Sequence, residues 1–363
     1  MTTSAFGTIR RLPSGSYRAR VRLRGTQLTL GSYRTRREAQ AAIAAAGGDA
    51  RANLVLDRAR GRQRLGEFAE QWWASRAGHR ISTRTRDRLI LDHDLLPFFG
   101  RMAIGDVSPA DVQAWVGALS ARPLSPTSVR RVFTILDQLL DAAVDTGVIG
   151  VNPAARARLP RISRAEMRFL TPAQLELLAG TITESYRAMV LTMAWATLRI
   201  GETIGLRRSD FDIAAGTLRV ANNLVEVAGQ LYEGPPKTAA GRRTMSLPSS
   251  LVAELACHLQ SFAGPMYLFP AAGGGPLRAA EWPKHHWYPA VEVAGLSPLR
   301  VHDLKHSGVA FLISAGVDPK EISRRAGHAS VAFTYDRYGH LLPEVDKQAA
   351  TKLEAVRAAT RLA

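Results

Sequence analysis

A proline- and arginine-rich segment divides this sequence and argues against a single continuous core. Residues 152–168 hold few apolar side chains and five arginines: Arg156, Arg158, Arg161, Arg164 and Arg168. Charge at this density is costly to bury without partners, so the segment is predicted to be an exposed linker between two bodies. The length of 363 residues also favours two or three domains over one.

The net charge limits the kinds of partner. It is +17, with an isoelectric point of about 10.8, which favours nucleic acid first and an anionic membrane second. The apolar run from Met189 to Leu198 is too short to span a membrane, and the N-terminal residues lack a secretory signal pattern. The single cysteine, Cys257, excludes an internal disulfide and a cysteine-based zinc cluster. We expect a cytoplasmic protein that binds nucleic acid and has no membrane partner.

Residues 6–33 are predicted to form a small β-sheet. Three strands are expected, near residues 8–12, 17–24 and 27–30. In the middle strand apolar residues alternate with arginines, which places the two kinds of side chain on opposite faces. Thr35 and Glu38 have the spacing of a capping box for a helix over residues 35–46, which would cover the apolar face. The other face would present Arg18, Arg20, Arg22 and Arg24. Four neighbouring like charges repel in water, so this face is better explained as a DNA-groove surface than as a solvated sheet.

Residues 65–150 are predicted to be all helical. Ser108-Pro109 and Ser125-Pro126 each pair an N-cap residue with proline at the first helical position, and apolar residues recur at helical spacing. Near the expected helix starts lie Arg84, Arg86, Arg130 and Arg131. Positive charge there opposes the helix dipole, so a DNA phosphate would relieve it. A solvated helix end explains each arginine alone equally well.

The chain from Thr171 onward is predicted to be mainly helical, with a group of strands within residues 212–247. Two cations in this part have both structural and functional explanations. Arg199 lies among apolar residues, three positions before Glu202, which would pair with it. Lys237 lies in a loop rich in glycine and proline, where a solvated lysine is the ordinary explanation.

Taken in order, several residues resemble a known active-site series. They are Arg199 in a Leu-Arg-Ile-Gly-Glu setting, Lys237, the pair His302-x-x-Lys305, Gly327-His328, and Tyr338 followed by Gly339-His340. Each motif is weak alone, but the order resembles that of the tyrosine recombinases, the phage integrase family. The resemblance covers the whole chain. It implies an arm-type DNA-binding domain over residues 1–60, a helical core-binding domain over residues 65–155 and a mixed α/β catalytic domain over residues 165–363. The expected fold class is therefore multidomain and mainly α, with small β-sheets.

This resemblance implies a site-specific DNA recombinase, the integrase of a phage or other mobile element, that needs no cofactor. Tyr338 would attack a phosphodiester to give a 3′-phosphotyrosine and a free 5′-hydroxyl. Arg199 and His328 would bind the phosphate. His302 would assist proton transfer from Tyr338, and Lys237 would protonate the leaving oxygen, because lysine can release a proton that arginine keeps.

The resemblance also implies partners. They are double-stranded DNA attachment sites, further copies of this chain in a tetramer on DNA, a DNA-bending host factor and an excisionase, within the nucleoid of a bacterial host. Residues 343–363 are predicted to form an amphipathic helix, which would dock either on a neighbouring subunit or on its own.

One residue departs from the family pattern, and it leaves alternatives open. Lys305 stands where the family usually has arginine, so the charge is kept but the bidentate fork is lost. A slower enzyme or a catalytically impaired DNA-binding regulator would both fit, and a shorter Xer-like resolvase is a further alternative. Tyr335 is the rival nucleophile, one helical turn before Tyr338. His302 and His306 have the spacing of a helical zinc pair, but no third ligand is evident, so metal independence is expected.

Overall fold

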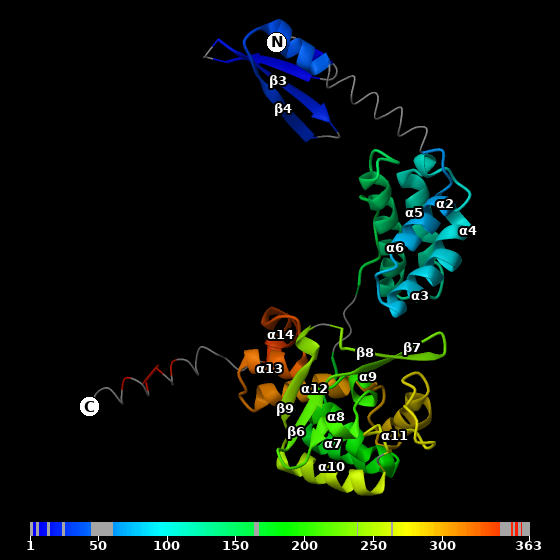
Figure 1. The fold of residues 1–363 in the computed structure, drawn as a ribbon, viewed down its shortest axis with the longest axis vertical. Coiled ribbons are helices and arrows are strands. Elements are labelled where there is room, and N and C mark those ends of the chain that lie inside the picture. Colours follow the sequence, from blue (N-terminus) through cyan, green and yellow to red (C-terminus); the bar gives the residue numbers. More distant parts are fainter. Residues whose placement is uncertain are drawn as a thin grey trace. The chain divides into compact units, whose positions relative to one another are not determined.

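The computed structural model describes most of the chain, which divides into two units. The described residues are 3–4, 7–12, 15–23, 26–44, 61–162, 167–237, 239–262 and 264–341, with positions 350, 353, 354 and 357. The first unit comprises residues 1–164 and the second residues 165–363 (Figure 1). The predicted fold class, multidomain and mainly α with small sheets, is confirmed.

The first unit begins with an antiparallel sheet. Its strands, in spatial order, are β1 (Thr3–Ser4), β2 (Gly7–Arg11), β3 (Tyr17–Leu23) and β4 (Thr26–Tyr33). The three predicted strands are present, and β1 adds a short edge. A helix over residues 36–44 covers one face, where Ala39 and Ile43 pack with Ala19 and Val21. The predicted alternation in β3 therefore buries its apolar residues beneath this helix.

The predicted capping box begins that helix. The Glu38 amide donates to Thr35 Oγ1 at 3.2 Å, and the Thr35 amide donates to Glu38 Oε2 at 3.3 Å. In β3, Arg18 and Arg20 are half-buried, and Arg18 lies directly opposite the exposed Arg10 of β2. Arg22 also lies in β3, and Arg24 lies outside the described residues. Opposed like charges on neighbouring strands repel unless an anion lies between them.

Residues 65–145 of the first unit are mainly helical, as predicted. Its helices are α2 (Leu65–Ser75), α3 (Ile81–Ile90), a π-helical turn (Leu91–Leu95), α4 (Leu96–Phe99), α5 (Pro109–Ser120) and α6 (Pro126–Asp145). Ser108 and Ser125 cap α5 and α6 through their side chains, each with proline at the first position. One apolar core, which includes Trp115 and Leu136, joins these helices.

The basic segment that follows α6 lies against these helices over residues 152–160. Ala154 is buried in their core. Gln113 of α5 exchanges two hydrogen bonds with the backbone of Arg158, and Arg130 Nε donates to the Pro160 carbonyl at 2.8 Å. Composition alone predicted a free linker here, whereas backbone polar groups fix this part of it.

The second unit has one large apolar core and a smaller one that includes Tyr338. Its helices are α7 (Pro172–Thr181), α8 (Arg187–Trp195), α9 (Ile200–Ile204), α10 (Ser249–Ser261), α11 (Tyr288–Val293), α12 (Val301–Ser314), α13 (Pro319–Ala326) and α14 (Val331–Tyr338). A three-stranded sheet is ordered β5 (Phe211–Asp212), β6 (Thr217–Val220), β9 (Arg243–Ser246), and β7 (Asn223–Val227) pairs with β8 (Gln230–Gly234) as a hairpin.

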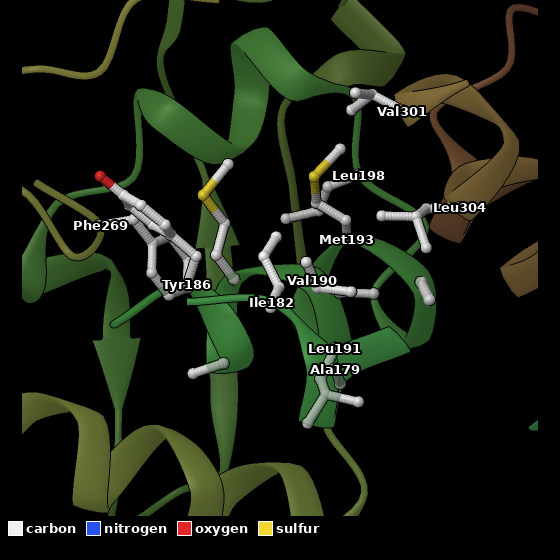
Figure 2. Close-up of a cluster of buried hydrophobic side chains, with 14 of the residues drawn as sticks. Ala179, Ile182, Tyr186, Val190, Leu191, Met193, Leu198, Phe269, Val301 and Leu304 are labelled. Carbon is white, nitrogen blue, oxygen red and sulfur yellow. The ribbon is translucent and has the colours of Figure 1, made fainter. Parts of the chain in front are cut away.

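The large core fixes residues from which the candidate site is built. Leu198 and Leu304, each next in sequence to a candidate catalytic cation, are fully buried in it (Figure 2). Helix α12 approaches α8 so closely at Gly308 that an added Cβ would lie 1.9 Å from the Ala194 carbonyl oxygen. Only glycine fits such an approach, so α12 is held firmly beside α8.

Among the described residues, none of the helices has the length and apolar character needed to cross a lipid bilayer.

Candidate active site

Arg199 lies at the start of α9, as its N-cap residue. Its Nη1 donates to Glu202 Oε1 at 2.8 Å, its backbone amide donates to Glu202 Oε2 at 3.0 Å, and its Nη2 reaches the Gly327 carbonyl at 3.4 Å. The side chain is nevertheless 42% exposed. The predicted pairing with Glu202 is therefore present, yet it leaves part of the guanidinium facing outward, where an anion could approach.

Glu202 is shared between two arginines. Arg243 of β9 is buried and donates from Nη2 to Glu202 Oε2 at 3.1 Å. Burial alone would raise the pKa of Glu202, but Arg243, Lys305 and Arg199 outweigh it and lower this pKa to about 2. The carboxylate stays ionised and holds Arg199 in place. Arg243 Nε also donates to the Arg325 carbonyl at 2.6 Å, which links β9 to α13.

Lys305 is buried beneath this arrangement, with only 2% of its surface exposed. Its Nζ donates to the Thr197 carbonyl at 2.9 Å and to the Ala326 carbonyl at 2.5 Å. Burial and the nearby Arg199 lower the pKa of Lys305 well below its usual value. Thr197 has φ +52°, a left-handed conformation that is uncommon for a β-branched residue, and the lysine contact helps to hold it. Lys305 thus ties the segment before Arg199 to the end of α13.

His328 follows directly after α13. That helix ends at Gly327 in the left-handed conformation, φ +62°, and the His328 amide then donates to the Ser323 carbonyl at 3.0 Å. His328 is buried, and its Nδ1 forms a hydrogen bond with Thr334 Oγ1 at 2.9 Å. Burial and the nearby Lys305 lower the pKa of His328 to about 3, so the ring is neutral near pH 7.

Tyr338 is the last residue of α14, and it is only 1% exposed. Its ring is stacked on that of His328, with centroids 6.1 Å apart and an angle of 11° between the planes. Burial raises the pKa of Tyr338 to about 12, although Arg337 and Arg199 act in the opposite direction. The rival Tyr335 is 49% exposed on the same helix. Only Tyr338 lies within the cluster of cations and histidines.

The hydrogen-bond partner of the Tyr338 hydroxyl is not the histidine that the sequence predicted. His306 Nδ1 lies 2.5 Å from Tyr338 Oη, and His306 is itself only 4% exposed. His302 was expected to serve the tyrosine, but its exposed ring packs edge-on against His306, with centroids 4.7 Å apart. Partial burial, Lys305 and Arg199 lower the pKa of His302, so it too is neutral near pH 7.

Lys237 occupies the loop after β8 and is exposed. The same loop reaches the site further along, because a Cβ added at Gly327 would lie 3.5 Å from the Ala240 carbonyl oxygen. The loop that carries Lys237 therefore borders the cluster formed by Arg199, His302, Lys305, His328 and Tyr338.

The four arginines that are expected to contact DNA in the helical part of the first unit have different surroundings. Arg86 pairs with the buried Asp87 at 2.7 Å, and Arg84 lies over the Trp73 ring, 4.6 Å from its centroid. Arg130 donates to a backbone carbonyl, and Arg131 is exposed. The ion pair with Asp87 is a structural reason for an arginine at position 86, and the position of Arg86 near a helix start did not indicate this pair.

No group of three histidine, cysteine or acidic side chains gathers as metal ligands within the part of the chain that the structure describes. His302 and His306 lie together, but their rings meet edge to face.

Comparison with known proteins identifies the family of this chain. The model of the phage integrase family matches residues 168–344, and that of the phage integrase central domain matches residues 65–159. A prophage integrase of Mycobacterium tuberculosis is 30% identical over 294 residues, which is 80% of this chain and 77% of that protein. The chain belongs to the phage integrase family. This recombinase is also 28% identical to the integrase of Mycobacterium phage L5 over 300 residues, 80% of this chain and 79% of that one.

Solved structures of other integrases share the fold of this recombinase. The Tn1549 transposon integrase, in complex with a circular intermediate DNA, has a TM-score of 0.69 at 20% identity and covers 81% of this chain and 99% of its own. A lambda integrase dimer bound to a core site has a TM-score of 0.59 at 18% identity, over 91% of this chain and 94% of its own. Family membership makes the chain a tyrosine-type site-specific recombinase.

Proposed function

We propose that this recombinase integrates the DNA of a phage or mobile element and that Tyr338 is its nucleophile. The observation that carries the assignment is the position of the Tyr338 ring, which is stacked on His328 inside a cluster that also contains Arg199 and Lys305. A phosphodiester in this cluster would meet a hydroxyl, a guanidinium and neutral imidazoles together. These are the groups that strand cleavage through a phosphotyrosine requires.

Each group has a role that follows from its contacts. Arg199, fixed by Glu202 but still exposed, binds the non-bridging oxygens as charge develops on phosphorus. His328 supports the same oxygens, and its Nδ1 contact with Thr334 fixes its ring. Lys237 protonates the leaving 5′-oxygen from the loop that borders the site. The bond energy is retained in the phosphotyrosine, so rejoining needs no nucleotide triphosphate.

Lys305 contributes charge and position rather than a bidentate bond. Its Nζ donates hydrogen bonds to the carbonyls of Thr197 and Ala326, next to the segments that carry Arg199 and His328. Protonation of this buried amine, which its surroundings oppose, would add positive potential to the phosphate site. The lysine in place of the usual arginine is therefore compatible with an active enzyme.

The remaining parts of the chain bind DNA in this proposal. Residues 1–60 act as an arm-type DNA-binding domain with Arg18 and Arg20 at the DNA, and residues 65–155 act as a core-binding domain. Residues 165–363 form the catalytic domain. The opposed pair Arg10 and Arg18 supports an anionic partner for the sheet. The active assembly is a homo-tetramer on double-stranded attachment sites in the bacterial nucleoid, assisted by a DNA-bending host factor and an excisionase. Most of the segment 343–363, which would link subunits, lies outside the described residues.

A nicked suicide substrate that carries the element's recombination site tests the proposal. Loss of the short fragment beside the nick prevents rejoining, so the enzyme should accumulate as a protein–DNA adduct that resists denaturation. Tyr338→Phe should abolish the adduct, and Tyr335→Phe should leave it intact. An adduct that persists in Tyr338→Phe contradicts the assignment.

Two alternatives make different predictions in the same assay. An impaired regulator, which Lys305 favours, would bind the site tightly and form no adduct. An Xer-like resolvase would form the adduct and recombine two identical sites after residues 1–60 are deleted. An integrase would lose integration between unlike attachment sites on that deletion while retaining cleavage.

A further inference from the structure

The Tyr338 hydroxyl forms a hydrogen bond with a histidine outside the expected catalytic series. His306 Nδ1 lies 2.5 Å from Tyr338 Oη, and both side chains are almost fully buried, at 4% and 1% exposed. The two residues are 32 positions apart and come from different helices, α12 and α14. Their contact is therefore made by the fold and not by local chain geometry.

The turn of α12 that carries His306 is fixed through the two residues that follow it. Ser307, the next residue, donates from Oγ to the Asp303 carbonyl at 2.8 Å and accepts from the Leu170 amide at 2.9 Å. Gly308 fixes the same turn of α12 against α8. A side chain on so constrained a turn is well suited to hold a reacting hydroxyl.

At neutral pH the tyrosine holds a proton and the histidine has a nitrogen that can accept it, but their pKa values oppose the transfer in the free protein. Burial and the neighbouring His302 and Arg337 lower the pKa of His306 to about 4, so its ring is neutral near pH 7 and has one nitrogen lone pair. Burial raises the pKa of Tyr338, so its phenol keeps the proton on Oη near pH 7. Four other charged or titratable groups interact electrostatically with His306 or with Tyr338: Asp303, Arg300, His328 and Arg199.

We propose that His306 is a further catalytic residue that accepts the phenolic proton of Tyr338 during strand cleavage. This inference depends on the proposed function, because it takes Tyr338 as the nucleophile. As the bond between Oη and phosphorus forms, the proton passes to His306 Nδ1, and the bond from phosphorus to the 5′-oxygen breaks. The 5′-oxygen takes a proton from Lys237. In rejoining, the imidazolium returns its proton to the departing tyrosine.

A bound phosphate makes this step easier than it is in the free protein. Cations around the site disfavour an imidazolium, and the negative charge of the phosphorane offsets them at the moment of transfer. His302 lacks this role because its ring contacts His306 and not the hydroxyl. It remains available to the phosphate from its exposed position on α12.

His306→Asn in the full-length chain tests the proposal. The asparagine amide occupies the position of Nδ1 and keeps a hydrogen bond to Tyr338, but it cannot take up a proton. DNA binding should match the wild type, whereas single-turnover cleavage should slow about 10²- to 10⁴-fold, the usual contribution of a general base. The residual rate should rise with pH, about tenfold per unit, because hydroxide must then remove the proton.

A substrate with sulfur at the 5′-bridging position separates the two proton transfers. A thiolate leaves without being protonated, so this substrate should restore cleavage in Lys237→Ala and should leave His306→Asn slow. His306→Gln, which places its amide at the position of Nε2, should be slow on both substrates. Circular dichroism and DNA binding confirm that each variant is folded.

Three results would overturn the assignment. Cleavage by His306→Asn at the wild-type rate, with an unchanged pH profile, would show that the contact has no catalytic role. Faster cleavage would show that His306 only restrains Tyr338 in the resting molecule. Rescue of His306→Asn by the 5′-sulfur substrate would place its defect on the leaving-group side. All three leave the adduct at Tyr338 intact, so they are distinguishable from failure of the proposed nucleophile.

Discussion

Two regions of this recombinase use cationic side chains in opposite ways. In the N-terminal sheet, Arg10 and Arg18 stand directly opposite each other on neighbouring strands of a surface. In the second unit, Arg243 and Lys305 are buried, and hydrogen bonds to a carboxylate or to backbone carbonyls fix them. Surface cations can move to meet any phosphate, whereas fixed cations can stabilise charge only at one point.

This difference separates affinity from chemistry. Exposed arginines supply binding that depends on salt but not on exact position. Fixed cations act by preorganisation, because nothing has to rearrange when charge develops on phosphorus. Changes in the sheet should therefore alter binding, and changes around Glu202 should alter the rate of cleavage.

The largest effect is expected at Arg199. Arg199→Ala should slow cleavage of bound DNA about 10²- to 10³-fold, the typical cost of removing one group that stabilises an oxyanion. Arg207→Ala is a matched control, because Arg207 is 40% exposed and paired with Glu233 at 2.7 Å, much as Arg199 is paired with Glu202. Single-turnover cleavage at saturating enzyme measures both. Equal losses in the two variants would remove the distinction between fixed and surface cations.

Lys305 gives the next test. Lys305→Arg should not accelerate cleavage, because a larger guanidinium must enter a site that is only 2% exposed; we expect a loss of about 1–3 kcal/mol in unfolding free energy. Lys305→Met should slow cleavage by about tenfold or more, since the carbonyls of Thr197 and Ala326 lose their donor. Lys284→Arg, on an exposed lysine, is the control. A many-fold gain in cleavage by Lys305→Arg would mean that the lysine is a handicap.

A smaller effect, confined to binding, is expected in the sheet. Replacing Arg18 and Arg20 together with alanine should weaken DNA binding and reduce the slope of log K against log salt by about one for each phosphate that the sheet no longer neutralises. The cleavage rate of fully bound suicide substrate should not change. Lys320→Ala, on an exposed lysine of α13, provides the comparison. An unchanged salt slope in the double variant would exclude the sheet from the DNA interface.

The last effect concerns stability and not DNA: it is a dependence of unfolding free energy on pH that arises in the buried site. The folded-state pKa values of His306 and His328, about 4 and about 3, lie below the ordinary 6.5, so the unfolded chain binds protons first as pH falls. Stability is thus complete above about pH 6.5 and is lost toward pH 4, by at most about 1.4 kcal/mol per unit for each histidine. Urea unfolding should show a shallower slope in His306→Asn. A flat stability from pH 7 to 5 would contradict these pKa values.

Local patterns predicted much of the fold. The alternation in β3, the Thr35–Glu38 capping box and the two serine caps all depend on residues near one another in sequence, and each is present. Strand β7 was not predicted. Its turn to β8 uses Ala228 and Gly229, with φ of +49° and +77°, where asparagine or glycine at the first position would have been a clearer signal.

Contacts between distant residues limited prediction of the site. The order of Arg199, His302, His328 and Tyr338 along the chain was visible in sequence, and these residues come together in the fold. The partner of the Tyr338 hydroxyl was not visible, because His302 and His306 occupy successive turns of one helix and only tertiary packing decides which ring meets the tyrosine. Arg243, which shares Glu202 with Arg199, gave no signal because its role depends on a contact across 41 positions.

The central claim is that the buried Tyr338, and not its exposed neighbour, becomes joined to DNA. Mass spectrometry of the protein trapped on a nicked suicide substrate, after digestion of both protein and DNA, tests it directly. The nucleotide remnant should lie on Tyr338 in every adduct. A remnant on Tyr335, or on any residue outside the second unit, would contradict it.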